Sequence, residues 1–450
     1  MTRAGVERVF RVPWSFDARA SVWRCDALHY ADVRQDLDDR CFGFDDRVRV
    51  PDAVAWPNVQ LHSLRPEQHQ AVEAWSKTGR GVVVMPTGTG KTEVAMSIMA
   101  EAAVATLIVA PIRDLMYQWH RRIDKGLGYN AGVLGDGSHD IKPITVTTYE
   151  SACIHMERIG DQFGLIVFDE CHHLPGRVRS DAARMCTAPL RLGLTATPES
   201  EAGKLLDLDP LVGPVVHQMS IAEARGTSLA EYDVVRIPIH LSETERRRYD
   251  RLSNEIRHYI LERTKADPWF TWKELCRETN DDPAARRALA AYHAKKSIED
   301  RAEEKLRVLE DLFRLHGSEP MIIFVGSNAM ARDVSLRFLV PCLLNHCGKE
   351  ERLDALQGLE AGIYPAVVAN RVLDEGVDLP EVKVAVVIGG GSGGRQAKQR
   401  LGRVLRKSGS ARAILYEVVC SDTNEEDRSR RRRRNDAYAV TRRRKKPRRK

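Results

Sequence analysis

The sequence predicts an α/β protein built on two doubly wound parallel sheets, with a small α+β module before them and a helical insert between them. From residue 64 onwards, short apolar runs alternate with amphipathic helical segments, and the runs are GVVVMP, ATLIVAP, ITVTTY, FGLIVFD and RLGLTAT. Such short, β-branched runs are typical of parallel strands buried on both faces, with helices crossing between them. Ligands bind at the carboxyl ends of the strands in sheets of this kind.

The alternation stops between about residues 240 and 316, where the sequence is charged and helical, and it resumes with PMIIFVG, AVVAN, VKVAVVIGG and ARAILYEVV. A chain of 450 residues is long enough for two or three domains. We therefore expect an accessory module over residues 1–61, an α/β domain over 62–218, a linker and helical insert over 219–300, a second α/β domain over 301–427 and a basic, disordered tail over 428–450.

The formal net charge of +7 is distributed unevenly along the chain. Residues 428–450 contain 14 Lys and Arg and one acid, which leaves 56 basic and 62 acidic residues in the rest of the sequence. A basic tail of this kind is more often an electrostatic anchor for nucleic acid than a merely solvated chain end, and both interpretations stay open. An anchor of this type adds affinity without sequence choice.

The sequence contains no run of about 18 apolar residues, and its first residues, MTRAGVERVFRVPWSF, lack the apolar stretch of a secretory signal. We therefore expect a cytoplasmic protein without a membrane association. The nine cysteines are scattered and include no Cys-x-x-Cys pair, which favours reduced thiols over a disulfide framework or an iron–sulfur cluster.

The segment MPTGTGKT, residues 85–92, follows the apolar run GVVV and precedes the helical sequence EVAMSIMAEAA. It has the spacing of a phosphate-binding P-loop, except that Met85 stands at the first glycine position. In a P-loop the backbone N–H groups surround phosphate oxygens, the lysine reaches the terminal phosphates and the last hydroxyl ligates Mg²⁺. The alternative is a turn with a solvated lysine. We expect a nucleotide site formed by Thr87, Gly88, Thr89, Gly90, Lys91 and Thr92.

The segment FDECHHLPG places two carboxylates at the end of another predicted strand. Nucleotide hydrolysis needs one carboxylate for the metal and a base that orients the attacking water, and Asp169 and Glu170 are in position for these roles. A zinc site of Cys171, His172 and His173 is the competing interpretation. Adjacent side chains diverge, whereas structural zinc ligands are usually about two to four residues apart, so we favour the carboxylates. A packing role stays open for His173.

With the P-loop and DECH in place, the chain resembles the superfamily 2 helicases, which implies RecA-like domains that hydrolyse ATP with Mg²⁺. The segment LRPEQ resembles the adenine-reading Q motif and assigns Gln68 to the adenine, although Glu67 replaces the aromatic residue common before it. The segments IVAPIRDLMYQW and ITVTTYE resemble motifs that contact the nucleic-acid backbone, which implicates Arg113, Thr147 and Thr148.

The same resemblance assigns coupling residues. The segment LTATP resembles the motif that couples hydrolysis to strand movement, which gives this role to Thr195 and Thr197. His172 of DECH is then expected to sense the γ-phosphate for these threonines.

In the second α/β domain, IIFVGS, NRVLDEGVDLPE and QRLGRVLR resemble the remaining motifs in their expected order. This implies that Gly376 and Asp378 face the ribose and the domain cleft, and that Gln399, Arg403 and Arg406 reach the γ-phosphate. The two arginines are three residues apart, so a helix presents both on one face. Their charge stabilises the transition state only when the cleft is closed. The alternative is a pair of surface arginines on a basic helix.

Within this superfamily the chain resembles the XPB (Rad25) DNA helicases, especially the compact archaeal and bacterial type. The resemblance covers residues 60–240 and 300–430 and includes FGLIVFDECHHLPG, RLGLTATPE and VLDEGVDLPEVKVAVVIGGGSGGRQAKQRLGRVLR. It implies an ATP-dependent 3′ to 5′ DNA helicase or translocase that acts in DNA repair on single strands, forks or duplexes. Residues 1–61 occupy the position of the family's damage-recognition module.

Two departures from the family pattern bear on this expectation. The family commonly has an Arg-Glu-Asp triplet after TATP, and here Ser200 and Ala202 stand at its first and third positions. Motif V usually begins with Thr, and this chain has Asn370. The first departure favours a duplex translocase without productive unwinding.

A further alternative is an ATP-switched DNA-binding subunit of a repair or defence complex. A nuclease or repair-complex partner fits either interpretation, and the expected location is the cytoplasm in association with the nucleoid. RNA is less favoured as a substrate, although no residue recognisably reads a 2′-hydroxyl.

Overall fold

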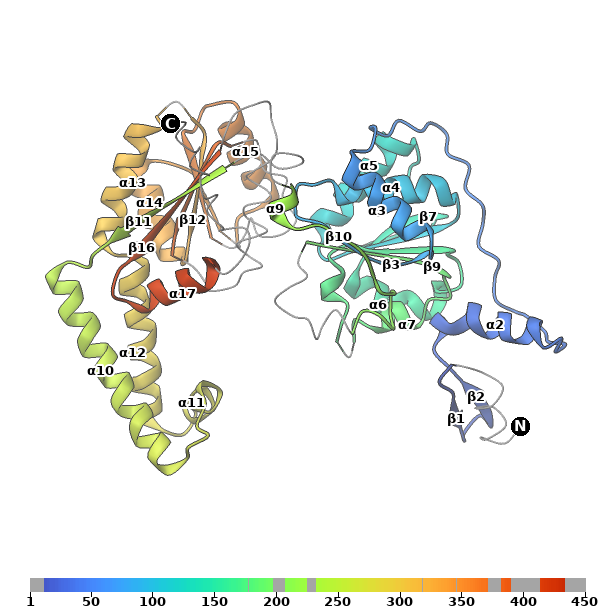
Figure 1. Ribbon diagram of the computed structural model, residues 1–450, viewed down its shortest axis with the longest axis horizontal. Helices are drawn as coiled ribbons and strands as arrows, with labels where there is room; N and C mark the ends of the chain where they lie inside the picture. The colour runs from blue at the N-terminus through green and yellow to red at the C-terminus, as the bar shows by residue number, and fades with distance from the viewer. Residues whose placement is uncertain are drawn as a thin grey trace, which may run out of the picture. The chain divides into compact units, whose positions relative to one another are not determined.

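The computed structural model describes residues 12–176, 178–196, 207–224, 232–317, 319–344, 346–370, 382–389 and 413–433. The chain divides into two compact units, Met1–Ala224 and Arg225–Lys450 (Figure 1). Each unit contains one large and mainly parallel sheet, which confirms the predicted fold class.

The first unit is built on an eight-stranded sheet with the order β10-β3-β9-β8-β4-β7-β5-β6. Neighbouring strands are parallel except for the antiparallel pair β5 and β6. The strands are β3 (Arg80–Val84), β4 (Thr106–Ala110), β5 (Gly132–Gly135), β6 (Ser138–His139), β7 (Ile144–Thr148), β8 (Leu165–Phe168), β9 (Leu190–Thr195) and β10 (Val215–Gln218). Because β3, β9 and β8 are neighbours, the segments that follow them leave from the same edge of the sheet.

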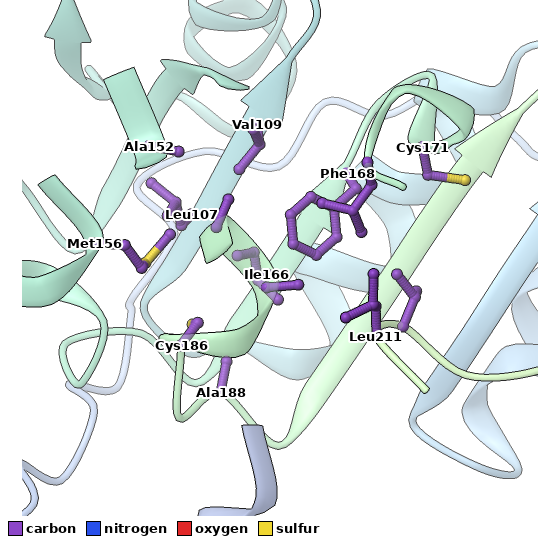
Figure 2. Packing of buried hydrophobic residues seen from close by; sticks show 14 of the residues in the cluster. Leu107, Val109, Ala152, Met156, Ile166, Phe168, Cys171, Cys186, Ala188 and Leu211 are labelled. Carbon is purple, nitrogen blue, oxygen red and sulfur yellow. The ribbon is translucent and has the colours of Figure 1, made fainter. Parts of the chain in front are cut away.

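Helices cover both faces of this sheet (Figure 1). The helices α3 (Pro66–Ser76), α4 (Lys91–Ala102) and α5 (Arg113–Leu127) lie on one face, and α6 (Tyr149–Ile159) and α7 (Asp181–Arg184) lie on the other. A short η2 (Cys171–His173) follows β8, and α9 (Ile221–Ala224) follows β10. Figure 2 shows the core on the α6 side, where side chains of β4, β8 and α6 pack together.

The described part of residues 1–61 is a small α+β module. It contains the antiparallel pair β1 (Ser15–Asp17) and β2 (Val22–Arg24), followed by η1 (Ala27–His29) and α2 (Tyr30–Asp39). Helix α2 has no buried residue, whereas Leu28 of η1 belongs to the core cluster of the first unit. An ion pair of 3.8 Å between Arg184 and Asp26 adds a second link. These contacts attach the segment around η1 to the first unit.

The second unit is built on a six-stranded parallel sheet with the order β11-β16-β15-β12-β14-β13. The strands are β11 (Tyr232–Ile239), β12 (Met321–Val325), β13 (Cys342–Leu343), β14 (Ala366–Ala369), β15 (Val384–Ile388) and β16 (Ala413–Cys420). The helices α13 (Glu303–Leu315), α14 (Asn328–Phe338) and α15 (Lys349–Glu360) precede β12, β13 and β14 along the chain.

The helical insert consists of α10 (Glu243–Ala266), α11 (Trp272–Glu278) and α12 (Pro283–Asp300). Ser242 and Glu245 form a capping box at the start of α10, and the Asp282 carboxylate accepts the N–H groups of Ala284 and Ala285 at the start of α12. Figure 1 shows α10 and α12 side by side, projecting from the second sheet with α11 at the far end.

The structure differs from the expected linker over residues 219–300 at one point. Residues Tyr232–Ile239 form β11, an edge strand that pairs along its whole length with β16. An edge strand accommodates Pro238, because the missing backbone N–H faces away from the partner strand.

The expected boundary of the basic tail is also wrong. Helix α17 (Asn424–Arg433) continues five residues past Arg428. The Arg428 guanidinium pairs with the buried carboxylate of Glu299, and the Ser429 hydroxyl donates to Glu417 at 3.0 Å. These contacts fix the first part of the arginine run to the second unit, so only residues 434–450 stay a predicted tail.

Candidate active site

The P-loop connects the carboxyl end of β3 to the start of α4. Gly88 and Gly90 have φ values of +86° and +83°, which L side chains rarely adopt. A Cβ on Gly90 would lie 2.2 Å from Gln68 Nε2, so any side chain at this position would displace the Gln68 amide. The backbone N–H of Met85 donates to Thr195 O at 3.0 Å, which ties the loop to the end of β9.

Gln68 holds the P-loop from the start of α3. Its Nε2 donates to Thr89 O at 2.9 Å, and its Oε1 accepts the backbone N–H of Arg65 at 2.8 Å. The Arg65 guanidinium donates to the same Thr89 carbonyl at 2.9 Å. Gln68 is only 3% exposed, so the structure places it against the loop backbone, and its expected contact with adenine stays a prediction.

The loop fits a phosphate group. Lys91 and Thr92 are the first two residues of α4, where backbone N–H groups have no partner within the helix. The Lys91 Nζ donates to Met85 O at 3.2 Å, which holds the ammonium over the loop. The Thr87 Oγ1 is buried and has no hydrogen-bond partner among the described residues. A phosphate oxygen would supply this partner.

Asp169 and Glu170 follow β8 directly, two strands away from β3. Each carboxylate oxygen of Asp169 has a donor: Trp119 Nε1–H lies 2.9 Å from Oδ2, and the backbone N–H of Glu170 lies 3.0 Å from Oδ1. Burial raises the pKa of Asp169 and the charge of Glu170 adds to this, while Trp119 and Lys91 act in the opposite direction. The Asp169 carboxylate is therefore buried, oriented and close to the P-loop lysine.

Glu170 has a left-handed backbone, with φ +47° and ψ +52°. This conformation costs a non-glycine residue about 1–2 kcal/mol and persists only where neighbouring contacts hold it. It turns the chain sharply after β8 into η2, so that Asp169 and Glu170 both lie at the sheet edge.

His172 connects this turn to β9. Its Nδ1 lies 3.1 Å from Thr195 Oγ1 and 3.3 Å from Glu170 Oε2. Its Nε2 is buried and has no hydrogen-bond partner in the described part of the chain. The structure thus brings together the carboxylate expected to act as base, the expected sensor and one of the expected coupling threonines.

The zinc interpretation has no support in the described residues. Cys171 belongs to the hydrophobic cluster of Figure 2, and its burial raises the pKa of its thiol well above the ordinary value. The His172 and His173 rings lie 4.2 Å apart, stacked in a tilted arrangement. Among the residues that the structure describes, no group of three or more His, Cys, Asp or Glu could hold a metal ion.

The residues expected to contact nucleic acid lie at the ends of β4 and β7. Arg113 begins α5, its side chain is 70% exposed and it pairs with Asp136 at 2.5 Å. Thr148 caps α6 by accepting the N–H of Ser151. The Thr147 hydroxyl is fully buried and donates to Leu134 O at 2.7 Å, so its side chain does not reach the surface.

Several expected site residues lie outside the described residues: Thr197, Gly376, Asp378, Gln399, Arg403 and Arg406, together with Ser200 and Ala202. Asn370 is described, and its Nδ2 donates to Asn328 Oδ1 at 2.7 Å. Sequence reasoning missed Trp119, whose indole reaches Asp169. The only feature of the sequence that could have indicated Trp119 is its place at the end of the motif IVAPIRDLMYQW.

A P-loop after β3 and a DECH turn after β8, on either side of β9 in one parallel sheet, in a chain with a second parallel sheet, define the ATP-hydrolysing helicase class of the P-loop proteins. The solved structure of the Pyrococcus furiosus Hef helicase domain has the same fold. It aligns with a TM-score of 0.56 at 17% identity and covers 80% of this chain and 97% of that one.

Family comparisons specify the class further. Residues 61–200 match the model "Type III restriction enzyme, res subunit", and residues 289–440 match "ERCC3/RAD25/XPB C-terminal helicase". The DNA 3′-5′ translocase XPB2 of Sulfurisphaera tokodaii is 38% identical over 91% of this chain and 93% of its own. The DNA 3′-5′ helicase XPB of Kineococcus radiotolerans is 30% identical over 81% of this chain and 61% of its own. The chain belongs to the XPB/Rad25 family of helicases.

The described helices include none that is long and apolar enough to cross a membrane.

Proposed function

We propose that this protein is an ATP-dependent 3′ to 5′ DNA translocase and helicase of the XPB type, acting in DNA repair. The observation that supports it best is the meeting of three segments at one sheet edge. The first backbone N–H of the P-loop segment donates a hydrogen bond to the Thr195 carbonyl. The Thr195 hydroxyl contacts His172, and His172 contacts the Glu170 carboxylate. A state change at the γ-phosphate can therefore reach β9 through two side-chain contacts.

Within the first unit we assign Lys91 to the β- and γ-phosphates and Glu170 to the attacking water. Thr92 and Asp169 would hold Mg²⁺, which when bound neutralises charge that develops on the phosphate oxygens. Glu170 accepts the proton or orients the water from a buried position, with 8% of the residue exposed. Gln68 would contact the adenine while it supports the loop.

The second unit would complete the site. By resemblance, Gln399, Arg403 and Arg406 would approach the γ-phosphate, and Gly376 and Asp378 the ribose and the cleft. An arginine in this role contributes about 10³- to 10⁵-fold to the rate in related phosphoryl-transfer systems. Hydrolysis would then depend on closure of one unit on the other, and successive closures would move the protein along DNA.

DNA would be held through its phosphates, by Arg113 and Thr148 in the first unit and by residues 434–450 in the predicted tail. Contacts of this kind do not read sequence. They fit a motor that works on any chromosomal sequence in the nucleoid, with the described module of residues 12–39 and a nuclease or repair complex as sources of specificity.

A duplex translocase without unwinding is the second candidate. The sequence that favours it is Ser200-Glu201-Ala202, where the family's Arg-Glu-Asp triplet would stand.

The tip of the helical insert supports the unwinding candidate instead. Trp269 is 85% exposed there, and an exposed aromatic side chain offers an element that separates DNA strands in place of the triplet.

The test is a steady-state ATPase assay without nucleic acid and with single-stranded DNA, duplex DNA or RNA, followed by unwinding of a forked duplex. We expect stimulation by DNA and displacement of the fork strand. Stimulation without displacement favours the pure translocase. Turnover that is indifferent to DNA contradicts the motor and leaves the ATP-switched binding subunit.

A further inference from the structure

The proposed mechanism does not use the hydrogen bond that Trp119 makes. It lies on α5 and is 2% exposed, and its Nε1–H donates to Asp169 Oδ2 at 2.9 Å. Helix α5 is the same helix that begins with Arg113, the residue expected to bind DNA phosphate. One helix therefore carries a DNA contact at its start and a contact with the metal carboxylate six residues later.

We propose that Trp119 is a positioning residue that orients the Asp169 carboxylate for Mg²⁺–nucleotide, and that DNA bound at Arg113 adjusts this orientation through α5. The inference rests on the proposed function, because it takes Asp169 as a metal ligand and Arg113 as a DNA contact.

The Asp169 backbone is fixed independently of Trp119. Its N–H donates to Val109 O at 2.9 Å, and its carbonyl accepts the Tyr149 hydroxyl at 3.0 Å. With its backbone fixed, Asp169 can move only by rotation of its side chain. The Glu170 N–H holds one carboxylate oxygen and the Trp119 indole holds the other. Two donors fix the plane of a carboxylate, whereas one donor leaves it free to turn.

Helix α5 is suited to carry a displacement. Its buried stripe of Met116, Trp119, Ile123 and Leu127 packs it against the sheet, and six residues of α-helix span about 9 Å. A helix of this length moves as a rigid element, so a shift at its first turn also moves the indole. A hydrogen bond of 2.9 Å transmits such a shift directly to Asp169.

The start of α5 is held by contacts that a phosphate can replace. Arg113 pairs with Asp136 at 2.5 Å, and the Tyr117 hydroxyl donates to the same carboxylate at 3.1 Å. Arg113 is 70% exposed, so DNA phosphate can compete with Asp136 for its guanidinium. Exchange of this partner gives bound DNA a means to alter the position of the first turn.

Simple core packing is the competing explanation for Trp119. Trp119→Phe separates the two, because phenylalanine keeps an aromatic ring in the core and lacks the indole N–H. The matched control is Trp75→Phe in α3. Trp75 is 4% exposed and also loses a buried indole hydrogen bond, in this case to Arg191 O at 2.9 Å.

The experiment measures the affinity of the purified full chain for a fluorescent ADP analogue as Mg²⁺ is titrated, with and without saturating duplex DNA. We expect Trp119→Phe to raise the Mg²⁺ concentration at half-maximal binding by roughly tenfold, the usual size of an outer-sphere effect on metal affinity. Its affinity for the analogue in EDTA should match that of the wild type. DNA should shift the Mg²⁺ midpoint in the wild type and in Trp75→Phe but not in Trp119→Phe.

An unchanged Mg²⁺ midpoint and an unchanged DNA shift in Trp119→Phe overturn the inference. A wild-type protein whose nucleotide affinity does not depend on Mg²⁺ contradicts the proposed function instead, so the two failures are distinguishable. If Trp119→Phe does not fold, Arg113→Gln at its exposed position tests the same link. It should lose the DNA-induced shift even at saturating DNA, and a full shift overturns the inference.

Discussion

The imidazole of His172 and the hydroxyl of Thr195 lie 3.1 Å apart, although the two residues belong to different strand ends and are separated by 23 positions in the chain. Both groups are buried, and Thr195 also receives the first N–H of the P-loop segment through its carbonyl. This pair connects the turn that bears Glu170 to the strand that leads into TATP.

We predict that His172→Ala weakens the coupling between hydrolysis and DNA. The Glu170 carboxylate and the P-loop stay in place, so nucleotide affinity should be kept, while the DNA-stimulated rate falls by about tenfold, a typical size for a coupling interaction. Paired measurements of analogue binding and DNA-stimulated ATPase check this. His173→Ala, which removes the neighbouring imidazole, is the control and should keep the stimulation.

A second prediction concerns Gly90. Gly90→Ala places a Cβ where Gln68 Nε2 lies 2.2 Å away, and its φ of +83° adds strain of about 1–2 kcal/mol. We expect lower stability together with a loss of nucleotide affinity. Gly137→Ala is a matched control, because it has a φ of +80° and open space around its Cβ position. A similar nucleotide affinity in both variants would show that the contact between Gln68 and the loop is dispensable.

A third prediction concerns the buried ion pair of the second unit. Lys305 and Glu425 are fully buried, and Lys305 Nζ lies 2.8 Å from each Glu425 oxygen. Burial alone would lower the pKa of Lys305 and raise that of Glu425, but their mutual attraction outweighs it and shifts each pKa in the opposite direction. Glu425→Gln should therefore cost about 3–5 kcal/mol of unfolding free energy, because it leaves a buried ammonium without its counter-charge.

The pH dependence of this stabilisation follows from the lowered pKa of Glu425. The contribution is complete above the ordinary glutamate pKa of about 4.3 and is lost as the pH falls through the lower folded value. Calorimetry should therefore show a difference in unfolding free energy between wild type and Glu425→Gln that becomes smaller in acid. Glu243→Gln, at the exposed pair with Arg247, is the control and should cost less than about 1 kcal/mol. A difference that becomes larger in acid contradicts the assignment.

A fourth prediction concerns the tail. Residues 434–450 contain nine Lys and Arg and one acid, and they follow the described part of α17. Their deletion should weaken DNA binding and make it less dependent on salt. Each lost phosphate contact should reduce the slope of log K against log salt concentration by about 0.9 in magnitude. A full-length variant with the nine bases changed to Gln is the control and should behave like the deletion. An unchanged slope in both variants would show that the tail does not anchor DNA.

The sequence was sufficient to predict the sheets and the placement of the P-loop and DECH. Continuous apolar runs such as LIVF predict buried parallel strands, and chemistry placed directly after such a run lies at the sheet edge. The α/β fold class and the XPB-type family follow from these local patterns and are confirmed. The nucleotide and DNA roles of individual residues stay predictions.

What the sequence did not predict depends on contacts between distant segments. Trp119 meets Asp169 across 50 positions, and no local pattern indicates that an indole on α5 faces the end of β8. Arg428 belongs to a charge run that is typical of a solvated tail, yet Glu299 at the end of α12 pairs with it. Arg191 is fully buried in β9 and donates to backbone carbonyls of four residues, which an arginine in an apolar run does not reveal.

The most direct test of the central claim is ATP turnover by purified Glu170→Gln, measured with and without duplex DNA beside the wild type and Lys91→Ala. We predict DNA-stimulated turnover in the wild type and none in either variant, while both variants keep DNA binding largely intact. Normal turnover in Glu170→Gln would contradict the assignment of this site as the centre of a DNA-driven ATPase.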